Sequence, residues 1–239
     1  MNIGFYTGAS GLVAFQGSMN VVGNNIANSE TIGYKPTEST FENLLQYRMY
    51  VNSTAEPLQG TGARNVTRGM DMEQGPMERT GNDMDYALTG DGFFAVDNGG
   101  TPAYTRCGAF AAAPDSTGTY YLADQRGHFV LNARGGRIPL TRDQLQGRYN
   151  DVSKQIGVFQ FKNPNNLTPL SDNLYAENTA SGQVAAGNAK VTNGFLEQSQ
   201  TQLSTEMANM ILAQRGFQLS ARVLQANNEV EDIVNNLRS

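Results

Sequence analysis

The sequence is poor in the residues on which most catalytic and metal sites depend. It has 1 cysteine, 1 histidine and no tryptophan among 239 residues. The single Cys107 excludes an intramolecular disulfide framework and a four-cysteine zinc site, and the single His128 excludes a two-histidine metal site within one chain. A Ser-His-Asp site would have to use His128, and no G-x-S-x-G sequence accompanies it. We therefore expect no catalytic residue, no cofactor and no metal, and a structural subunit that is not an enzyme.

Charge and long apolar runs are scarce as well. Charged residues make up 16% of the chain and the net charge is −5, which gives no electrostatic reason to bind nucleic acid. No run approaches the ~18–20 apolar residues that span a bilayer, so we expect no membrane insertion. Residues 1–15 contain no lysine or arginine, so the basic region of a secretory signal is missing. If the chain leaves the cytoplasm, we expect export without a cleaved signal peptide.

Proline placement divides the chain into three parts. All 8 prolines lie from Pro36 to Pro169, and since proline inside a helix costs ~3 kcal/mol, both ends are free to be helical. We predict an α+β fold, in which long N- and C-terminal helices pack as a coiled coil and the centre is an antiparallel β-rich domain. The predicted ranges are 1–35 together with 196–239 for a helical polymerisation domain, 36–82 for a connecting arm, and 83–195 for a β-rich outer domain.

Both ends carry apolar residues at steps of three and four, the spacing of a stripe along one helix face. The N-terminal stripe, before Gly33 and Pro36 stop the helix, comprises Phe5, Gly8, Leu12, Phe15, Met19, Val22 and Ile26. The C-terminal helix is predicted from about Thr201 to Arg238, and its first stripe comprises Leu212, Leu219, Val223, Ala226, Val230, Ile233 and Leu237. A second stripe comprises Leu203, Met207, Met210, Phe217, Ala221 and Leu224, so we expect more than one neighbour. Gly216 is interpreted as a tolerated interruption costing ~1 kcal/mol.

The middle alternates between strand formers and turns. Asn98-Gly99-Gly100 predicts a hairpin turn between strands at 93–96 and 103–105, and further strands are expected at 120–122, 128–131 and 156–161. Within the arm we expect a short helix at 41–45, a loop at 52–62 and extended chain at 65–77. The carboxylates of Asp83, Asp85 and Asp91 lack the pattern of a calcium loop and are read as turn residues.

The amphipathic ends have three possible destinations: the chain's own β domain, each other, or further subunits. A C-terminal helix of roughly 55 Å would overhang a central domain only ~30–35 Å across. Exposed apolar stripes of that extent mark interaction surfaces. We therefore predict that the ends fold as they assemble.

Three blocks of sequence carry a resemblance to a known family. The first runs through Ala9-Ser10-Gly11-Leu12, Asn24-Asn25-Ile26-Ala27-Asn28 and Thr31-Ile32-Gly33-Tyr34-Lys35; the second comprises Gly90-Asp91-Gly92-Phe93-Phe94 and Tyr104-Thr105-Arg106; the third comprises Gly194-Phe195-Leu196-Glu197-Gln198-Ser199 and Ala213-Gln214-Arg215-Gly216-Phe217. Together they resemble the bacterial flagellar axial proteins, which are the rod and hook subunits of the basal body. The chain departs from the family pattern at Ser29-Glu30, Cys107 and Phe217.

The resemblance implies a subunit that passes partly unfolded through the flagellar export apparatus. It then polymerises with itself into the hollow axial tube that transmits torque and conducts exported subunits. It implies contacts with adjacent rod and hook proteins and with the surrounding ring proteins, and a location in the basal body. Residues 80–85, 161–167, 173–175 and 180–182 are most similar to distal-rod members of the family. The alternatives are a proximal-rod or hook subunit, or a secreted assembly or adhesin protein outside the flagellum.

Residues at the subunit interface are expected on both helices. The predicted set is Leu12, Phe15, Met19, Val22, Asn24, Asn25, Ile26, Asn28, Met207, Met210, Ile211, Gln214, Arg215, Leu219, Val223, Val230, Ile233 and Leu237. The three asparagines either form a polar helix face or hydrogen-bond neighbouring subunits, and the resemblance favours the second. The motif residues expected in the β domain are Gly90, Gly92, Phe93, Phe94, Tyr104, Thr105 and Arg106.

Overall fold

The structure is a computed structural model, and it describes residues 3–44, 46–48, 58–115, 118–141, 152–182 and 184–238. The chain forms two compact units. Unit 1 comprises Met1–Ala27, Thr37–Gly69 and Gln202–Ser239, and unit 2 comprises Asn28–Pro36 and Met70–Thr201. The chain therefore passes between the units four times.

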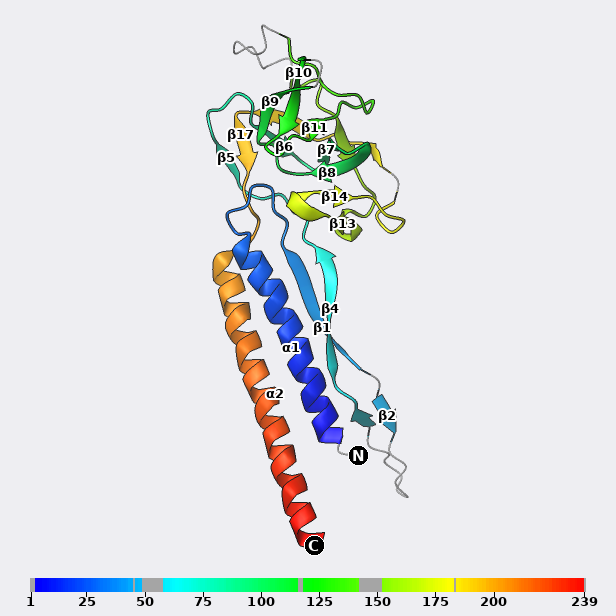
Figure 1. Ribbon diagram of the computed structural model, residues 1–239, viewed down its shortest axis with the longest axis vertical. Helices are drawn as coiled ribbons and strands as arrows, with labels where there is room; N and C mark the ends of the chain where they lie inside the picture. Colours follow the sequence, from blue (N-terminus) through cyan, green and yellow to red (C-terminus); the bar gives the residue numbers. More distant parts are fainter. Residues whose placement is uncertain are drawn as a thin grey trace. The chain divides into compact units, whose positions relative to one another are not determined.

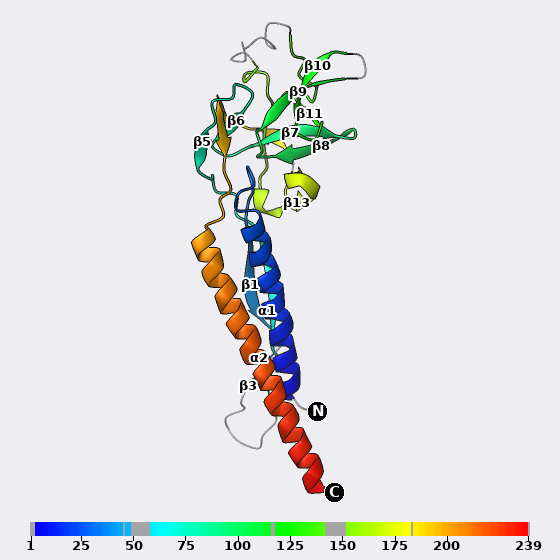
Figure 2. The ribbon, with the colours of Figure 1, turned by 60° about the vertical axis from the view of Figure 1, so that its left-hand side comes forward.

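Unit 1 is built on two helices that lie side by side, α1 (Ile3–Ala27) and α2 (Leu203–Arg238) (Figures 1 and 2). They run antiparallel, because Gly4 near the start of α1 lies against Asn227, and Asn25 near its end contacts Glu206. Glu206 also stands in the first turn of α2, where a carboxylate interacts favourably with the helix dipole. Both terminal helices predicted from the sequence are confirmed.

A β-hairpin completes unit 1. Strand β1 (Thr37–Asn43) pairs with β4 (Ala63–Met70), and β2 (Gln46–Arg48) pairs with β3 (Leu58–Gly60). The ring of Phe41 on β1 lies 5.0 Å from that of Phe15 on α1. The predicted helix at 41–45 is therefore wrong for residues 41–43, which extend along β1 because the hairpin gives Phe41 a partner on α1. Leu45 and residues 52–57 of the expected loop lie outside the described residues. The loop prediction is wrong for residues 58–60, which form β3 because they pair with β2.

Unit 2 is a β structure with mainly short strands. Its largest sheet has the order β13-β14-β8-β7-β11-β10-β9, with β12 joining β7 to β15. The bounds in that sheet are β7 Phe93–Asn98, β8 Thr101–Thr105, β9 Phe110–Pro114, β10 Tyr120–Asp124, β11 Phe129–Val130, β12 Val158–Gln160, β13 Thr168–Pro169, β14 Tyr175–Ala176 and β15 Ala185–Ala186. Two further pairs are β5 (Met77–Arg79) with β17 (Phe195–Glu197), and β6 (Tyr86–Thr89) with β16 (Lys190–Asn193). Short 3-10 turns occupy Pro164–Asn166 and Ser171–Asn173.

The centre of the main sheet, at β7, is buried on both faces. Along β7, Phe94 and Val96 enter one hydrophobic cluster, while Phe93 and Ala95 enter another. This alternation follows from the two-residue period of a strand. The predicted hairpin around Asn98-Gly99-Gly100 is confirmed: β7 pairs antiparallel with β8, and both glycines have positive φ.

The α+β class with a central antiparallel region is thus confirmed, while the predicted ranges differ from the two units. Of the expected arm at 36–82, residues 37–69 belong to unit 1 and 70–82 to unit 2. Residues 28–35, expected with the helices, belong to unit 2. The reason lies in the hydrogen bonds and ion pairs that residues 31–36 make with the β structure.

Candidate assembly site

The face of α1 that meets α2 is lined by small residues. Gly4, Gly8 and Gly11 follow one another at steps of four and three. A Cβ atom at Gly8 would stand 3.1 Å from Cγ of Leu224, and one at Gly11 would stand 2.9 Å from Oγ of Ser220. These glycines let the two backbones approach closely. Of the predicted N-terminal stripe, Gly8, Phe15 and Val22 are on or near this face, whereas Phe5 is exposed.

Gly216 on α2 has a packing role that the sequence did not indicate. A Cβ atom at this position would stand 2.3 Å from Cε1 of Phe15. The interpretation of Gly216 as a mere interruption of the helix is therefore wrong: the ring of Phe15 occupies the space beside the glycine.

The Asn25 side chain is buried and forms hydrogen bonds within unit 1. It is 2% exposed. Its Nδ2 donates to the carbonyl oxygen of Thr37 (3.0 Å) and to Oε1 of Glu206 (3.2 Å), while its Oδ1 accepts from the Thr37 amide (3.0 Å). Asn24 is exposed and Asn28 is half-buried, and Asn28 Oδ1 accepts from the Thr31 hydroxyl at 3.1 Å. The three predicted asparagines thus lie in three different environments.

The first predicted stripe of α2 is exposed to solvent. We call it the outer stripe, and its large members run from Leu212, 68% exposed, to Leu237, 83% exposed, through Leu219, Val223, Val230 and Ile233. The residues that face α1 form a different line that includes Met210, Ala213 and Leu224. Met207 and Ile211 are also exposed. One face of α2 therefore packs on α1, while a second apolar face has no cover within the part of unit 1 that the structure describes.

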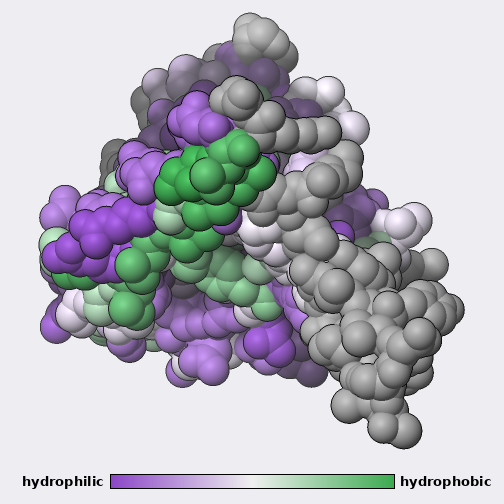
Figure 3. Space-filling model, turned by 90° about the horizontal axis from the view of Figure 1, so that it is seen from below, coloured by the Kyte–Doolittle hydropathy of each residue, from purple (hydrophilic) through white to green (hydrophobic). Residues whose placement is uncertain are grey.

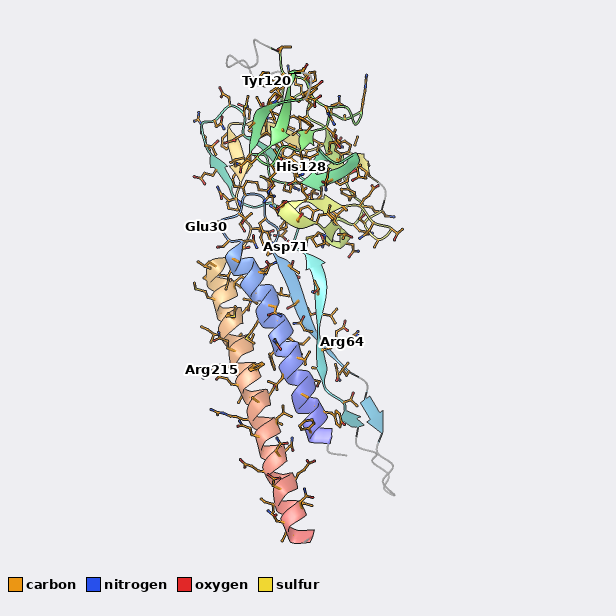
Figure 4. The ribbon with its side chains drawn as sticks, viewed as in Figure 1. Glu30, Arg64, Asp71, Tyr120, His128 and Arg215 are labelled. Carbon is orange, nitrogen blue, oxygen red and sulfur yellow. The ribbon has the colours of Figure 1, made fainter. Side chains whose placement is uncertain are left out.

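The last turns of α2 extend past the described start of α1 (Figures 1 and 2). Since Gly4 lies against Asn227, this overhang consists of residues 228–238, roughly 16 Å of helix. It carries four exposed apolar side chains, those of Val230, Ile233, Val234 and Leu237. Seen from below, apolar residues drawn in green gather on the surface (Figure 3). Arg215, by contrast, lies on the side of α2 that faces away from α1 (Figure 4).

A buried cluster of charges forms a second candidate site, in unit 2. Nζ of Lys35 lies 2.7 Å from Oε1 of Glu197, and Nη1 of Arg106 lies 3.2 Å from Oε2 of the same carboxylate. Lys35 and Glu197 are each 1% exposed and Arg106 is 2% exposed. The Gly75 amide also donates to Oε1 of Glu197 at 2.9 Å, and the Arg106 guanidinium stacks over the Phe93 ring. We call Lys35, Arg106 and Glu197 the ion cluster.

Burial disfavours the charged forms of these side chains, and their ionic partners stabilise the charged forms. Burial lowers the pKa of the Lys35 amine, while the Glu197 carboxylate acts to raise it. The Lys35 ammonium also donates to the carbonyl oxygen of Glu73. Removing one member of such a set leaves an uncompensated buried charge, which costs far more than the net value of the intact pair.

Residues 31–36, which we call the strap, are bound in unit 2 along their length. The Gly33 amide donates to the carbonyl oxygen of Glu197 (2.8 Å). Asn173 Nδ2 donates to the Ile32 carbonyl (2.8 Å). Gly33 has φ +66°, and a Cβ atom there would stand 2.7 Å from the carbonyl carbon of Arg106, so only glycine fits without strain. Further backbone bonds run from Gln200 to Tyr34 and from Asp71 to Pro36.

The predicted motif residues of the β domain form the interior of unit 2. Phe93, Phe94 and Tyr104 are buried in its two hydrophobic clusters, and Arg106 belongs to the ion cluster. The Thr105 hydroxyl donates to the Asn173 carbonyl at 3.0 Å. Gly90 has φ +103°, and a Cβ atom at Gly92 would stand 2.7 Å from Val158. Sequence reasoning singled out these positions, but it did not assign roles to Lys35 and Glu197, because no spacing pattern connects residues 162 positions apart.

His128 and Cys107, the other side chains considered for chemistry, lie in environments that explain them structurally. Nδ1 of His128 lies 2.8 Å from the Asp124 carboxylate, in the turn between β10 and β11. Burial raises the pKa of the Cys107 thiol, which disfavours a reactive thiolate. Among the described residues, no group of three or more histidine, cysteine or carboxylate side chains is placed to bind a metal ion. Neither helix, over its described length, is long and apolar enough to cross a membrane.

Comparison with known proteins matches both ends of the chain to family models. Residues 5–35 match the family described as "Flagella basal body rod protein", and residues 192–237 match "Flagellar basal body rod FlgEFG protein C-terminal". The first match ends at Lys35 and the second includes Glu197. The two matched regions therefore contain the two partners of the closest ion pair in the ion cluster.

Whole-length relatives agree with these matches. The flagellar basal-body rod protein FlgG of Bacillus subtilis (strain 168) is 33% identical, with 96% of this chain and 97% of that protein covered. FlgG of Borreliella burgdorferi is 30% identical, with 98% and 97% covered. The flagellar basal-body rod protein FlgF of Caulobacter vibrioides is 29% identical, with 96% and 95% covered.

Proposed function

Because this chain belongs to the family of flagellar basal-body rod proteins, we propose that it forms the distal part of the rod as a self-polymerising subunit. It is a structural subunit of the flagellar basal body, and its α+β architecture consists of an N-terminal helix, a C-terminal helix and a central antiparallel β region. The FlgG relatives favour the distal rod. A proximal-rod or hook subunit of the same family is the second candidate, since a rod protein with another name, FlgF, matches the chain over a similar length.

The outer stripe of α2 is the observation that carries the proposal. Six large apolar side chains at helical spacing are exposed, and the overhang at residues 228–238 extends them beyond α1. Burial of apolar surface contributes about 25 cal/mol per Å², so a helix of another copy would bind here. In the polymer, α1 and α2 form a coiled-coil layer and unit 2 makes the lateral contacts.

The predicted interface residues divide under this proposal into three groups. Leu219, Val223, Val230, Ile233 and Leu237 bind neighbouring copies, together with exposed Met207 and Ile211. Met210, Val22 and Phe15 hold α1 and α2 together within one copy, as does Asn25. Half-exposed Leu12, Met19 and Ile26, and polar Asn24, Asn28, Gln214 and Arg215, border the neighbours.

The subunit acts without catalysis or cofactor. It meets adjacent rod and hook proteins at the ends of its segment and ring proteins at its periphery. It reaches the basal body through the flagellar export apparatus without a cleaved signal peptide. His128→Ala tests the enzymatic alternative, because full motility with this variant excludes a reaction that depends on the histidine.

A truncation tests the assembly role. The chain without residues 228–239 is expressed in cells that lack their own copy, and basal bodies are purified for electron microscopy. We expect no motility and no completed rod, while the truncated protein keeps the cooperative unfolding of unit 2. Normal rods built from the truncated chain would refute the proposal. Antibody labelling of basal bodies that contain the full chain distinguishes the distal from the proximal rod.

A further inference from the structure

The outer stripe of α2 has a spacing that two antiparallel copies of the helix share. From Leu212 to Leu237, with Gly216 included, its positions follow in alternating steps of four and three, so the stripe reads the same from either end. When Val223 of one copy faces Ala226 of the other, the remaining layers are Leu219 with Val230, Leu212 with Leu237, and Gly216 with Ile233. The overlap comprises residues 212–237, roughly 39 Å of helix.

The two flanks of the outer stripe differ in charge and exposure. One flank faces α1 and consists of the uncharged residues Ala213, Ser220 and Asn227. The opposite flank is exposed, and its members follow in steps of seven: Arg215, Arg222, Glu229 and Asn236. Arg215 lies on the side of α2 away from α1 (Figure 4). Only the exposed flank therefore offers charges to another helix.

These charges distinguish between antiparallel registers. In an antiparallel helix pair the equivalent flanks of the two helices lie beside one another, and charged residues there form interhelical ion pairs. In the register with Val223 opposite Ala226, Arg222 of each copy lies beside Glu229 of the other. The symmetric pair thus forms two ion pairs, and the third charge, Arg215, lies beside the uncharged Asn236.

Sliding the copies by seven residues gives poorer registers. One slide pairs Arg215 with Glu229, but it places Arg222 beside its own equivalent and Leu237 opposite Thr205. The other slide places Glu229 beside its own equivalent and leaves Leu212 beyond the end of the partner helix. Like charges held side by side are unfavourable. Only the first register combines all the apolar layers with two ion pairs and no contact between like charges.

A parallel pair would make no use of these charges. In parallel helices in register, the exposed flank of each helix lies beside the opposite flank of its partner. That opposite flank is uncharged and faces α1, as the contacts of Ser220 and Asn227 show. A parallel pair therefore gains apolar contacts alone, and the charge pattern favours the antiparallel pair.

We propose that, outside the rod, two copies of the chain pair antiparallel along their outer stripes, with Arg222 of each copy bonded to Glu229 of the other. A twofold axis relates the two halves of this contact, so the pair is closed and does not grow into a polymer. It covers the apolar side chains that carry the proposed assembly, and it keeps them from binding other surfaces before assembly. This protective role rests on the proposed function, whereas the pairing itself does not.

Charge reversal in the full-length chain tests the ion pairs. Glu229→Arg and Arg222→Glu each replace both ion pairs by contacts between like charges, and both positions are exposed on α2. Sedimentation equilibrium should show a reversible dimer for the unsubstituted chain. We expect each single variant to raise the dissociation constant of the dimer at least about tenfold. Asp232→Arg is the matched control, because Asp232 is exposed but lies off this flank, and it should leave the dissociation constant unchanged.

An equimolar mixture of the two variants separates pairing from a general effect of charge. One chain is then basic and the other acidic at positions 222 and 229, so both ion pairs form again between unlike copies. We expect the mixed dimer to bind at least about tenfold more tightly than either variant binds itself. A mixture that associates no more tightly than the separate variants would overturn the proposal.

Disulfide trapping tests the direction of the helices. In a Cys107→Ser background, a chain with Leu219→Cys is mixed with a chain with Val230→Cys and oxidised. The antiparallel register places these two positions in one layer, whereas parallel helices in register separate them by roughly 16 Å along the axis. We expect the mixed disulfide to dominate on non-reducing gels. Dominance of the disulfide between two Leu219→Cys chains would overturn the antiparallel pairing.

Two results for the unsubstituted chain would also refute the proposal. One is a chain that stays monomeric up to its solubility limit, and the other is association that continues past the dimer. None of these measurements uses assembled rods. Normal rods built without residues 228–239 would refute the assembly role and leave the dimer of the full chain unaffected, so the two failures are distinguishable.

Discussion

The ring of Phe15 on α1 fills the space that a side chain at Gly216 on α2 would need. A Cβ atom at position 216 would stand 2.3 Å from Cε1 and 2.4 Å from Cζ of this ring. The ring also lies 5.0 Å from that of Phe41 in the hairpin, with the two planes inclined by 51°. One glycine thus makes room for a side chain that contacts both α2 and β1.

We expect Gly216→Ala to destabilise unit 1 although alanine favours helix. The gain in helix propensity is ~1 kcal/mol, whereas forcing an extra carbon into a packed site costs about 1–3 kcal/mol. Gly23→Ala is the matched control, because its Cβ would meet the Met210 methyl group at 3.7 Å, an ordinary contact. Urea unfolding of the full chain, followed by circular dichroism at 222 nm, compares the two. Equal stability changes for both variants would contradict the packing role of Gly216.

Glu197→Gln should destabilise unit 2 strongly. It leaves the buried Lys35 and Arg106 without their carboxylate, a loss of about 3–5 kcal/mol. Replacing all three residues, as Lys35→Met, Arg106→Met and Glu197→Leu, should cost less than the single change, because no buried charge is left unpaired. The measurement is the free energy of unfolding in urea, followed by tyrosine fluorescence.

The control for the ion cluster is the exposed pair of Arg64 and Glu42, whose side chains are 63% and 49% exposed. Glu42→Gln should cost less than about 1 kcal/mol. If Glu197→Gln and Glu42→Gln cost the same, the ion cluster does not hold unit 2 together.

Protonation of Asp97 in acid should lower the stability of unit 2. The hydrogen bond from the Gly100 amide, followed by that from Arg137, holds the pKa of its carboxyl below the ordinary value of 3.8. Since the folded carboxyl binds a proton less readily than the unfolded one, its stabilisation is complete above the unfolded pKa. It is lost as the pH falls through the lower, folded pKa.

Asp97→Asn tests this pH dependence. At neutral pH we expect the melting temperature to fall by about 2–4 °C, corresponding to about 1 kcal/mol. The difference from the unsubstituted chain should shrink once the pH drops below 3.8. Differential scanning calorimetry between pH 7 and pH 2.5 follows the effect, and Asp91→Asn, at an exposed position, is the control. A difference that stays constant down to the lowest pH would show that titration of Asp97 plays no part.

Val230→Ser and Ile233→Ser together should block assembly without weakening the monomer. Both side chains are exposed on the overhang, so the unfolding free energy should change by less than about 0.5 kcal/mol for each. The readout is swimming in soft agar, with electron microscopy of basal bodies. Gln225→Ser with Glu229→Ser removes exposed polar groups from the same part of α2, and this pair should leave motility intact. Motile cells with the apolar pair substituted would show that the overhang is not an assembly surface.

Local patterns were sufficient to predict the helices and the central hairpin. Prolines are absent from both ends, apolar residues recur at helical steps, and Asn98-Gly99-Gly100 supplies the positive φ angles of a tight turn. Periodicity located apolar stripes on both helices, but it could not tell which faces of α1 and α2 would pack together. Small residues determine this: the face of α1 with Gly4, Gly8 and Gly11 lets α2 approach most closely.

Long-range partners could not be predicted in this way. Phe41 becomes part of a strand because it reaches Phe15, 26 positions earlier in the chain. Lys35 looks like an ordinary charged residue before a proline until Glu197 is placed beside it. Each of these outcomes depends on tertiary contacts that leave no spacing signal in a single sequence.

The fourfold passage of the chain between its two units has a consequence for grafting parts among relatives. Residues 70–201 look like a self-contained insert, yet unit 2 also includes Asn28–Pro36. A chimera that exchanges only the long segment would set the native strap against a carboxylate and an arginine from the relative. A hybrid that receives residues 28–36 together with residues 70–201 from the same relative should fold and function. We therefore expect these two segments to change together among relatives.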